Sequence, residues 1–358
     1  MSITLPCIVT DSELQLLRPI PRWKYDPASD LFHIGRGFPF DLLLCCGMLR
    51  LVVFPYGEDM CKKLIMLVLL LAPALVVQAA PDKAITQKQV DDLTTTVLKY
   101  TSSPKLSSSI ALIYDEQEQR PLYSKNANAV VPIASITKLM TAIVVLDAEL
   151  PLDEKITISV FDFDILKGSH SRMRIGMTLT RGELLNLALM SSENRAAAAL
   201  ARTYPGGTSA AVAMMNAKAL ELGMMKTHFR DPTGLNSGNT STAQDLVKML
   251  IAAQHYKLIH KYSTTASHLV TVPGFPPLRF GNTNPLVKNA SWDIGVSKTG
   301  YINEAGRCLV MHAHIMHRPV IIVLLDSQGK YTRVGDANRI KKWMESAAAT
   351  RGRNTRRG

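Results

Sequence analysis

The chain has 358 residues and a mass of 39.4 kDa, enough for one large domain or two ordinary ones. Hydrophobic residues make up 47% and charged residues 20%, a composition that excludes a disordered, collagen-like or polytopic membrane protein. The net charge of +12 predicts attraction to polyanions, without distinguishing nucleic acid from lipid head groups or cell-wall polymers. All cysteines except Cys308 lie within the first 61 residues, so no disulfide can form in the rest of the chain.

An uncharged apolar run predicts that the protein is exported. Residues 64–80 read LIMLVLLLAPALVVQAA, and two lysines stand directly before them. A short basic stretch, an apolar run and small residues at a cleavage position are typical of a secretory signal peptide. We therefore predict a signal peptide over residues 60–80, cleaved near Ala79 or Ala80, with a retained membrane anchor as the alternative.

Two further segments flank the predicted signal peptide. Residues 1–59 precede it, although export signals normally begin a chain. Our hypothesis is that they are a gene-model extension and that translation starts at Met60, and a disordered tail is the alternative. Residues 81–107 are polar and are interpreted as a leader segment before the folded domain.

The first predicted elements of the folded domain are a strand pair followed by helices. Residues 108–114 form a β-branched, apolar run, and residues 121–124 can pair back with it across a polar turn. From Ser135 onward the apolar residues follow a helical period. Clusters of Gly, Pro and Asn separate further helical segments, which are expected at residues 181–189, 193–201, 208–222 and 242–256.

Strand-like runs return near the C-terminus. Short turns separate them, so the sequence predicts antiparallel hairpins formed by residues 294–301, 307–315 and 319–326. A last helix is predicted over residues 336–348, with an apolar face for packing on a sheet that consists of Ala337, Ile340, Trp343 and Met344. Strands at both ends with helices between them predict one α/β domain over residues 108–348, followed by a basic tail at residues 349–358.

Three short motifs follow one another along this domain: Ser135-Ile-Thr-Lys138 at a helix start, Ser192-Glu-Asn194 between helices and Lys298-Thr-Gly300 on a strand. The three-residue spacing places the Ser135 and Lys138 side chains on one helix face, about one turn apart. A serine hydroxyl is a poor nucleophile until a base removes its proton, and Lys138 can be that base only when it is neutral. Burial and a second nearby cation, for which Lys298 is a candidate, both favour the neutral amine.

A purely structural interpretation of each motif is also available. Taken singly, the motifs fit an N-cap serine, a solvated helix lysine and an ordinary charge on an edge strand. Their occurrence in this order, each on a suitable element, favours an active site. The amide of Ser135 supports this interpretation, because first-turn N–H groups of a helix are unpaired and can face a developing oxyanion.

The sequence around the motifs resembles the low-molecular-mass penicillin-binding proteins, a family of serine DD-peptidases, and within it the endopeptidase branch. The resemblance covers roughly residues 105–348 and is carried by residues 132–141, 187–197, 231–235, 297–301 and 303–311. It implies a β-lactamase/DD-peptidase-like α/β fold, in which helices flank an antiparallel sheet and form a helical subdomain.

The resemblance also implies the catalytic roles and the reaction. Ser135 would be the acylated nucleophile, Lys138 its proton acceptor and Ser192 the relay that passes the proton to the leaving amine. The expected reaction opens D-Ala–diaminopimelate cross-links of peptidoglycan in the periplasm through an acyl-enzyme, and β-lactam antibiotics would acylate the same serine. No metal or other cofactor is expected, and nucleic acid is not an expected partner.

The remaining motif residues would bind the substrate. Asn194 would hold the peptide backbone, Lys298 would set the local field, and Thr299 would bind a carboxylate. Gly300 and Tyr301 complete this stretch, with the Tyr301 amide joining that of the nucleophile in the oxyanion hole.

The length of the C-terminal part bears on the branch of the family. Carboxypeptidase members carry an additional C-terminal β-domain and an amphipathic anchor. Two strands and one helix use nearly all residues after Gly300, which leaves no room for such a domain and favours an endopeptidase over a carboxypeptidase. A membrane-surface anchor is the alternative for the final helix, because Lys341, Lys342 and the arginine-rich end suit anionic lipid.

Three other functions are compatible with parts of the sequence. A class A β-lactamase needs a glutamate that activates the deacylating water, but no Glu-x-x-x-Asn pattern occurs between Ser192 and Lys298. His312-Ala-His314 places two imidazoles on one strand face, as a zinc site would, yet strand histidines are usually surface or core residues. A penicillin-binding envelope scaffold with little activity, its basic surface on anionic envelope polymers, is the non-enzymatic alternative.

Overall fold

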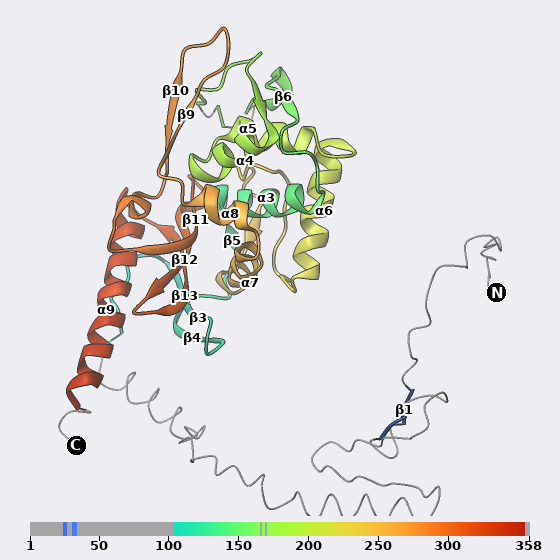
Figure 1. Cartoon of the computed structure of the whole chain (residues 1–358). Coiled ribbons are helices and arrows are strands. Elements are labelled where there is room, and N and C mark those ends of the chain that lie inside the picture. The colour runs from blue at the N-terminus through green and yellow to red at the C-terminus, as the bar shows by residue number, and fades with distance from the viewer. Residues whose placement is uncertain (1–23, 27–30, 34–102, 165–166, 169, 355–358) are drawn as a thin grey trace, which may run out of the picture. The chain divides into compact units, whose positions relative to one another are not determined.

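The computed structural model describes residues 24–26, 31–33, 103–164, 167–168 and 170–354 of the chain (Figure 1). The chain divides into two compact units, Met1–Ala84 and Ile85–Gly358. The described residues of the first unit form an antiparallel pair of strands, β1 (Lys24–Asp26) and β2 (Leu31–His33). The predicted signal peptide and most of the predicted leader lie outside the described residues, so both stay predictions.

A five-stranded antiparallel sheet forms the centre of the second unit. In sheet order its strands are β11 (Asp293–Ile302), β12 (Gly306–Ile315), β13 (Arg318–Ser327), β3 (Ile110–Asp115) and β4 (Arg120–Lys125). The pairing of β13 with β3 places Leu112 opposite Val323 and so joins segments from the two ends of the domain. The predicted strands and hairpins are confirmed, and they belong to one sheet.

The two faces of the sheet bury separate apolar layers, because side chains alternate along each strand. One layer contains Leu112, Val310 and Val323 and belongs to the large cluster that the helices between the strands complete. The opposite layer, which includes Ile113 and Met311, is covered by the C-terminal helix α9 (Thr332–Asn354) (Figure 1).

Helix α9 packs on the sheet through the apolar face that the sequence predicts. Ala337 and Ile340 are fully buried, and Trp343 and Met344 pack against the same cluster. The helix starts before the predicted residue 336 and continues to Asn354, so its predicted end at residue 348 is wrong. Alanine and arginine, which dominate this stretch, are strong helix formers, and no proline interrupts them.

In the described part of the chain, six α-helices lie between β4 and β11. They are α3 (Thr137–Asp147), α4 (Arg181–Met190), α5 (Asn194–Arg202), α6 (Gly207–Glu221), α7 (Ala243–Gln254) and α8 (Lys257–Ser263). The single helix predicted over residues 242–256 is wrong at its end, because Tyr256 is extended and separates α7 from α8. None of the helices within the described residues has the length and apolarity needed to cross a bilayer.

Several short elements that the sequence analysis did not predict connect these helices and strands. They are the strand pairs β5 (Val131–Pro132) with β8 (Thr240–Ser241), β6 (Lys155–Thr157) with β7 (Thr178–Thr180) and β9 (Ser267–Val270) with β10 (Leu278–Gly281), and the 3-10 helices η2 (Ala134–Ile136), η3 (Val160–Asp162) and η4 (Pro285–Lys288). Strands β9 and β10 form the long hairpin at the top of Figure 1. Helix η2 carries Ser135 directly into α3.

Candidate active site

The first predicted motif forms a close pair of side chains. Ser135 lies in η2 and Lys138 in the first turn of the buried helix α3, and the Lys138 Nζ to Ser135 Oγ distance is 2.9 Å. The Lys138 amine also donates to Asn194 Oδ1 at 2.8 Å and to the Thr233 carbonyl at 2.6 Å. The three-residue spacing therefore places both side chains together, as predicted.

The surroundings of Lys138 define which proton it can take. A neutral amine has two N–H groups and one lone pair, and the oxygens of Asn194 and Thr233 accept its two hydrogens. The lone pair then faces the Ser135 hydroxyl, which becomes the donor. This arrangement suits proton transfer from serine to lysine.

Burial makes the neutral form of Lys138 accessible near neutral pH. The side chain is fully buried, and the loss of solvation lowers its pKa from 10.5 to about 7. The charges of Asp231, Glu193 and Asp164 act in the opposite direction and favour the protonated form. The balance leaves a large fraction of Lys138 neutral at pH 7 and above.

The second and third motifs meet across the site. Lys298 on β11 donates to Ser192 Oγ at 2.8 Å and to the Thr299 carbonyl at 2.9 Å. Burial lowers the pKa of Lys298, and the nearby charges of Lys138 and Arg333 lower it further. Ser192 lies in the turn before α5 with a φ of 61°, a left-handed conformation that non-glycine residues rarely adopt. The structure thus brings all three motifs into one cluster.

Strand β11 is positioned for binding an extended peptide. It forms an edge of the five-stranded sheet, so its outer backbone groups are available for pairing with another strand. A side chain at Gly300 would lie 3.0 Å from the Ile133 carbonyl oxygen and 3.1 Å from the Ser135 amide nitrogen. Glycine therefore allows β11 to approach η2 closely, and the next residue, Tyr301, is half exposed beside it.

A carboxylate-centred turn supports Lys138 from the other side. Asp231 accepts hydrogen bonds from the backbone amides of Thr233, Gly234 and Asn236 at 2.6 to 2.8 Å. The same carboxylate accepts the Thr233 hydroxyl at 2.6 Å. These bonds fix the turn whose Thr233 carbonyl receives the Lys138 amine. The sequence analysis used this stretch only for its resemblance, although an Asp-Pro-Thr-Gly run is a local signal for such a turn.

Two groups near the third motif were missed in the sequence analysis. The Thr283 hydroxyl, which follows β10, lies 2.7 Å from the Thr299 hydroxyl. Arg333, at the start of α9, carries a positive charge that acts on Lys298, and its Nε and Nη1 atoms have no hydrogen-bond partner among the described residues. Neither residue stands in a motif, so only the folded chain brings them to the site.

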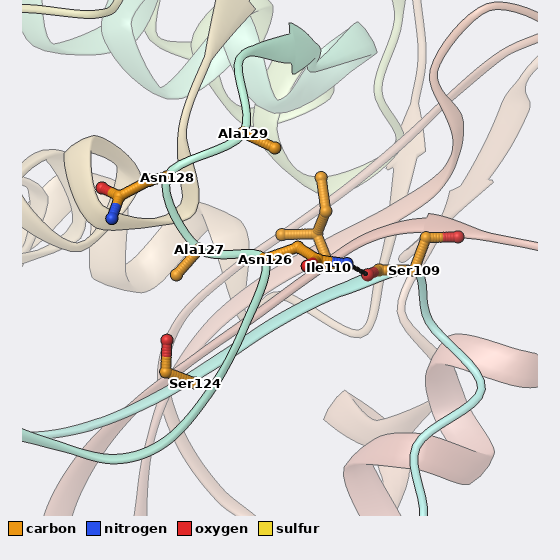
Figure 2. Close-up of a pocket in the computed structure, with 7 residues that line it drawn as sticks. All are labelled: Ser109, Ile110, Ser124, Asn126, Ala127, Asn128 and Ala129. Atoms are coloured by element: carbon orange, nitrogen blue, oxygen red, sulfur yellow. Dashed lines mark hydrogen bonds between the residues drawn. The ribbon is translucent and has the colours of Figure 1, made fainter.

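A small hollow continues from the catalytic groups. Its volume is about 150 Å³, and it is lined by Phe161, Asp162, Phe163, Asp164, Asn194, Ala198, Thr208, Asp231, Pro232, Thr233 and Leu235. A larger, open hollow of about 550 Å³ lies elsewhere, beside the start of β3, and contains no motif residue within the described chain (Figure 2). Asn126 closes one side of the larger hollow by donating to the Ser109 carbonyl at 2.9 Å (Figure 2).

The histidines of β12 are each placed against one carboxylate. His312 Nε2 lies 3.2 Å from Glu116, and His314 Nδ1 lies 3.3 Å from Asp293. In the residues that the structure describes, no three His, Cys, Asp or Glu side chains are grouped as a metal site requires.

The peptidase family described as D-alanyl-D-alanine carboxypeptidase matches residues 97–329, most of the chain. The chain belongs to that family. Relatives of this peptidase include D-alanyl-D-alanine endopeptidases of Pseudomonas aeruginosa and Escherichia coli K12. The first is 50% identical over 248 residues, which are 69% of this chain and 80% of the relative. The second is 49% identical over 247 residues, which are 68% and 79% of the two chains.

Solved structures agree with this membership. The DD-transpeptidase of Streptomyces K15 superposes with a TM-score of 0.63 at 29% identity, over 68% of this peptidase and 98% of that chain. Penicillin-binding protein D2 of Listeria monocytogenes, in its ampicillin-bound form, gives a TM-score of 0.59 at 28% identity, over 68% and 99% of the two chains. The resemblance to serine DD-peptidases and the predicted fold are therefore confirmed.

Proposed function

We propose that this peptidase is a DD-endopeptidase that hydrolyses D-Ala–diaminopimelate cross-links of peptidoglycan through an acyl-enzyme on Ser135. The observation that carries the proposal is the fully buried amine of Lys138, 2.9 Å from the Ser135 hydroxyl and with a pKa of about 7. The names of the two relatives that are 50% and 49% identical to it over the aligned residues support an endopeptidase.

Acylation begins with the transfer of the Ser135 proton to Lys138 Nζ. The Ser135 oxygen attacks the carbonyl carbon of D-Ala, and the negative charge that develops on the carbonyl oxygen is met by the backbone amides of Ser135 and Tyr301. The close approach of β11 to η2 at Gly300 is what brings these two amides to one side of the site.

Collapse of the tetrahedral intermediate breaks the amide bond. The departing diaminopimelate nitrogen must gain one proton, and Ser192 passes it from the lysine pair because its hydroxyl contacts Lys298 Nζ at 2.8 Å. Water then attacks the D-Ala ester and gives its proton to the neutral Lys138. Protonated Lys138 returns this proton to the Ser135 oxygen as the ester bond breaks, and the D-Ala product leaves as a carboxylic acid that releases its remaining proton to water.

Asn194 and the edge of β11 bind the substrate. The amide side chain of Asn194 holds the backbone of the substrate peptide, while Lys298 and Thr299 face the carboxylate that stands beside the scissile bond. Thr283 orients the Thr299 hydroxyl, at 2.7 Å, and Arg333 adds positive charge on the same side. A carboxylate next to the broken bond therefore meets cationic groups.

The site also fits reaction with penicillins. This reaction would take place in the periplasm, after export directed by the segment at residues 60–80. A β-lactam presents a strained amide and a neighbouring carboxylate, the two features that the Ser135 and Thr299 ends of the site address. The ampicillin-bound form of the Listeria relative supports this part of the proposal. The basic net charge of +12 favours contact with anionic envelope polymers.

Removal of terminal D-Ala is the second candidate activity, favoured by the description of the matching family as a carboxypeptidase.

A labelling experiment and a digestion decide between the possibilities. Fluorescent penicillin should label the purified protein one-to-one on the peptide containing Ser135 and should not label Ser135→Ala. Purified dimeric muropeptides should yield monomers, whereas release of free D-Ala from pentapeptides without dimer cleavage would establish the carboxypeptidase. A folded protein that is never labelled would contradict both activities, whereas labelling on Ser135 without turnover of either substrate would favour the penicillin-binding scaffold.

A further inference from the structure

The middle residue of the second motif is a buried carboxylate. Glu193 stands between Ser192 and Asn194, precedes α5, and is only 8% exposed. Motif spacing requires only the serine and the asparagine, so the identity of the residue between them is unexplained. A carboxylate is costly to bury unless hydrogen bonds or cations compensate for the lost water. The contacts of Glu193 therefore point to its role.

One hydrogen-bonded serine ties Glu193 to the segment that covers the turn. The Ser171 hydroxyl donates to Glu193 Oε2 at 2.6 Å and accepts from the Met173 amide at 3.1 Å. The accepted bond leaves the single hydroxyl hydrogen of Ser171 for Glu193. Glu193 is thus the residue through which the turn holds the segment from Ser171 to Met173.

Two arginines beside Glu193 extend this connection. The Arg195 guanidinium donates to the Met173 carbonyl and stacks over the Phe163 ring at 3.7 Å. The Arg172 guanidinium donates to a backbone carbonyl of β10 and lies 4.1 Å from the Phe280 ring. The turn of the second motif, the covering segment and the β9–β10 hairpin are therefore joined around Glu193.

The charge of Glu193 also acts on the catalytic pair. Burial raises the pKa of Glu193, while its hydrogen bond with Ser171 and the charges of Arg172, Lys138 and Arg195 lower it. In return Glu193 raises the pKa of Lys138, together with Asp231 and Asp164. Because the neighbouring Asn194 accepts a hydrogen bond from the Lys138 amine, the turn that Glu193 fixes is also in direct contact with that amine.

We propose that Glu193 is a positioning residue of the acylation step, which holds the Ser192–Asn194 turn through Ser171 and sets by its charge the pH range in which Lys138 accepts the serine proton. The inference rests on the proposed function of Lys138 as the base. Ser192 keeps a left-handed backbone conformation, which a non-glycine residue retains only where the surrounding structure imposes it. The hydrogen bond between Ser171 and Glu193, called the clamp below, supplies that restraint on the adjacent residue.

The charge and the clamp can be separated by substitution. Glu193→Gln removes the charge but keeps an oxygen that accepts from Ser171, whereas Glu193→Asp keeps the charge and shortens the reach. Ser171→Ala keeps the charge of Glu193 and removes its hydrogen bond with Ser171, together with the bond that Ser171 accepts from the Met173 amide. The control is Glu221→Gln, which changes a carboxylate that is 65% exposed on α6.

The readout is the second-order rate constant of acylation by fluorescent penicillin between pH 5 and 9, on the whole chain. Loss of the anion lowers the pKa of Lys138, so Glu193→Gln should move the acid limb of the profile to lower pH by roughly one unit. Glu193→Asp and Ser171→Ala should keep the limb in place and lower the plateau by about tenfold. The control should match the wild type.

Each outcome decides the proposal separately from the proposed function. A limb of Glu193→Gln that coincides with the wild type refutes the charge effect, and an unchanged plateau in Ser171→Ala refutes the clamp. Should Glu193→Gln fail to fold, a displaced limb in Glu193→Asp overturns the proposal instead. Absence of wild-type labelling on Ser135 would contradict the proposed function itself.

Discussion

Replacement of Lys138 by methionine should change how the stability of this peptidase depends on pH. Lys138 is fully buried, and burial lowers its pKa from 10.5 to about 7. Between these two values the unfolded chain binds a proton at this position that the folded protein does not. By linkage, the free energy of unfolding of the wild type rises as the pH increases through this window.

The expected size follows from the pKa difference. One pKa unit corresponds to about 1.4 kcal/mol, so the full window is worth about 4–5 kcal/mol and the interval from pH 7 to 9 roughly 2 kcal/mol. Lys138→Met lacks this part of the pH dependence, because methionine cannot be protonated. At pH 7 the variant also avoids the cost of burying an ionisable amine. Part of this gain in stability is offset, because Asn194 Oδ1 and the Thr233 carbonyl each lose a hydrogen-bond donor, at about 1–3 kcal/mol each.

Urea denaturation at several pH values measures this difference directly. The free energy of unfolding of the wild type should rise by roughly 2 kcal/mol more than that of Lys138→Met between pH 7 and 9. Lys257→Met, which removes an exposed lysine, should follow the wild type. Parallel curves for the wild type and Lys138→Met would show that Lys138 is charged throughout, and would remove the physical basis for its function as a base.

Three further substitutions test separate parts of the site. Ser192→Ala should lower turnover of dimeric muropeptides by about 10²–10⁴-fold with an unchanged circular dichroism spectrum, and near-normal turnover would exclude the proton relay. Gly234→Ala should lower the free energy of unfolding in urea by about 3 kcal/mol, because Gly234 has a φ of +85° and a Cβ would overlap the Ala134 carbonyl. An unchanged midpoint would contradict that close approach. Thr283→Val should raise KM for dimeric muropeptides about tenfold, because the Thr299 hydroxyl loses its 2.7 Å partner, and an unchanged KM would exclude this orienting contact.

The sheet and the three motifs were predictable because their signals are local. The strands over residues 293–302, 306–315 and 318–327 are long apolar runs separated by short turns, so their pairing follows from chain connectivity. The contact between Ser135 and Lys138 follows from helical spacing alone. The first motif lies on a buried helix and the third on an edge strand, so a correctly predicted fold is sufficient to place them near each other.

Other parts of the site depend on contacts between distant segments. Thr283 reaches Thr299 from the loop after β10, and Arg333 acts on the site from a helix that follows the last strand. Neither carries a local pattern that distinguishes it from other polar residues. Helix α8 (Lys257–Ser263), directly after the predicted helix end at Tyr256, escaped prediction for a different reason, because seven residues are too few to show a helical period.

The two buried lysines are best understood as one titrating unit. Lys138 and Lys298 are both fully buried, and the charge of Lys138 lowers the pKa of Lys298. Burial favours the neutral form of both amines, so the pair resists binding two protons, and the neutral amine of Lys138 can receive the Ser135 proton. Asp231, Glu193 and Asp164 act on the Lys138 side, and Arg333 acts on the Lys298 side. The acid limb of the acylation profile therefore reports protonation of this pair, and Glu193, which the motif spacing itself does not require, can move the limb through its charge on Lys138.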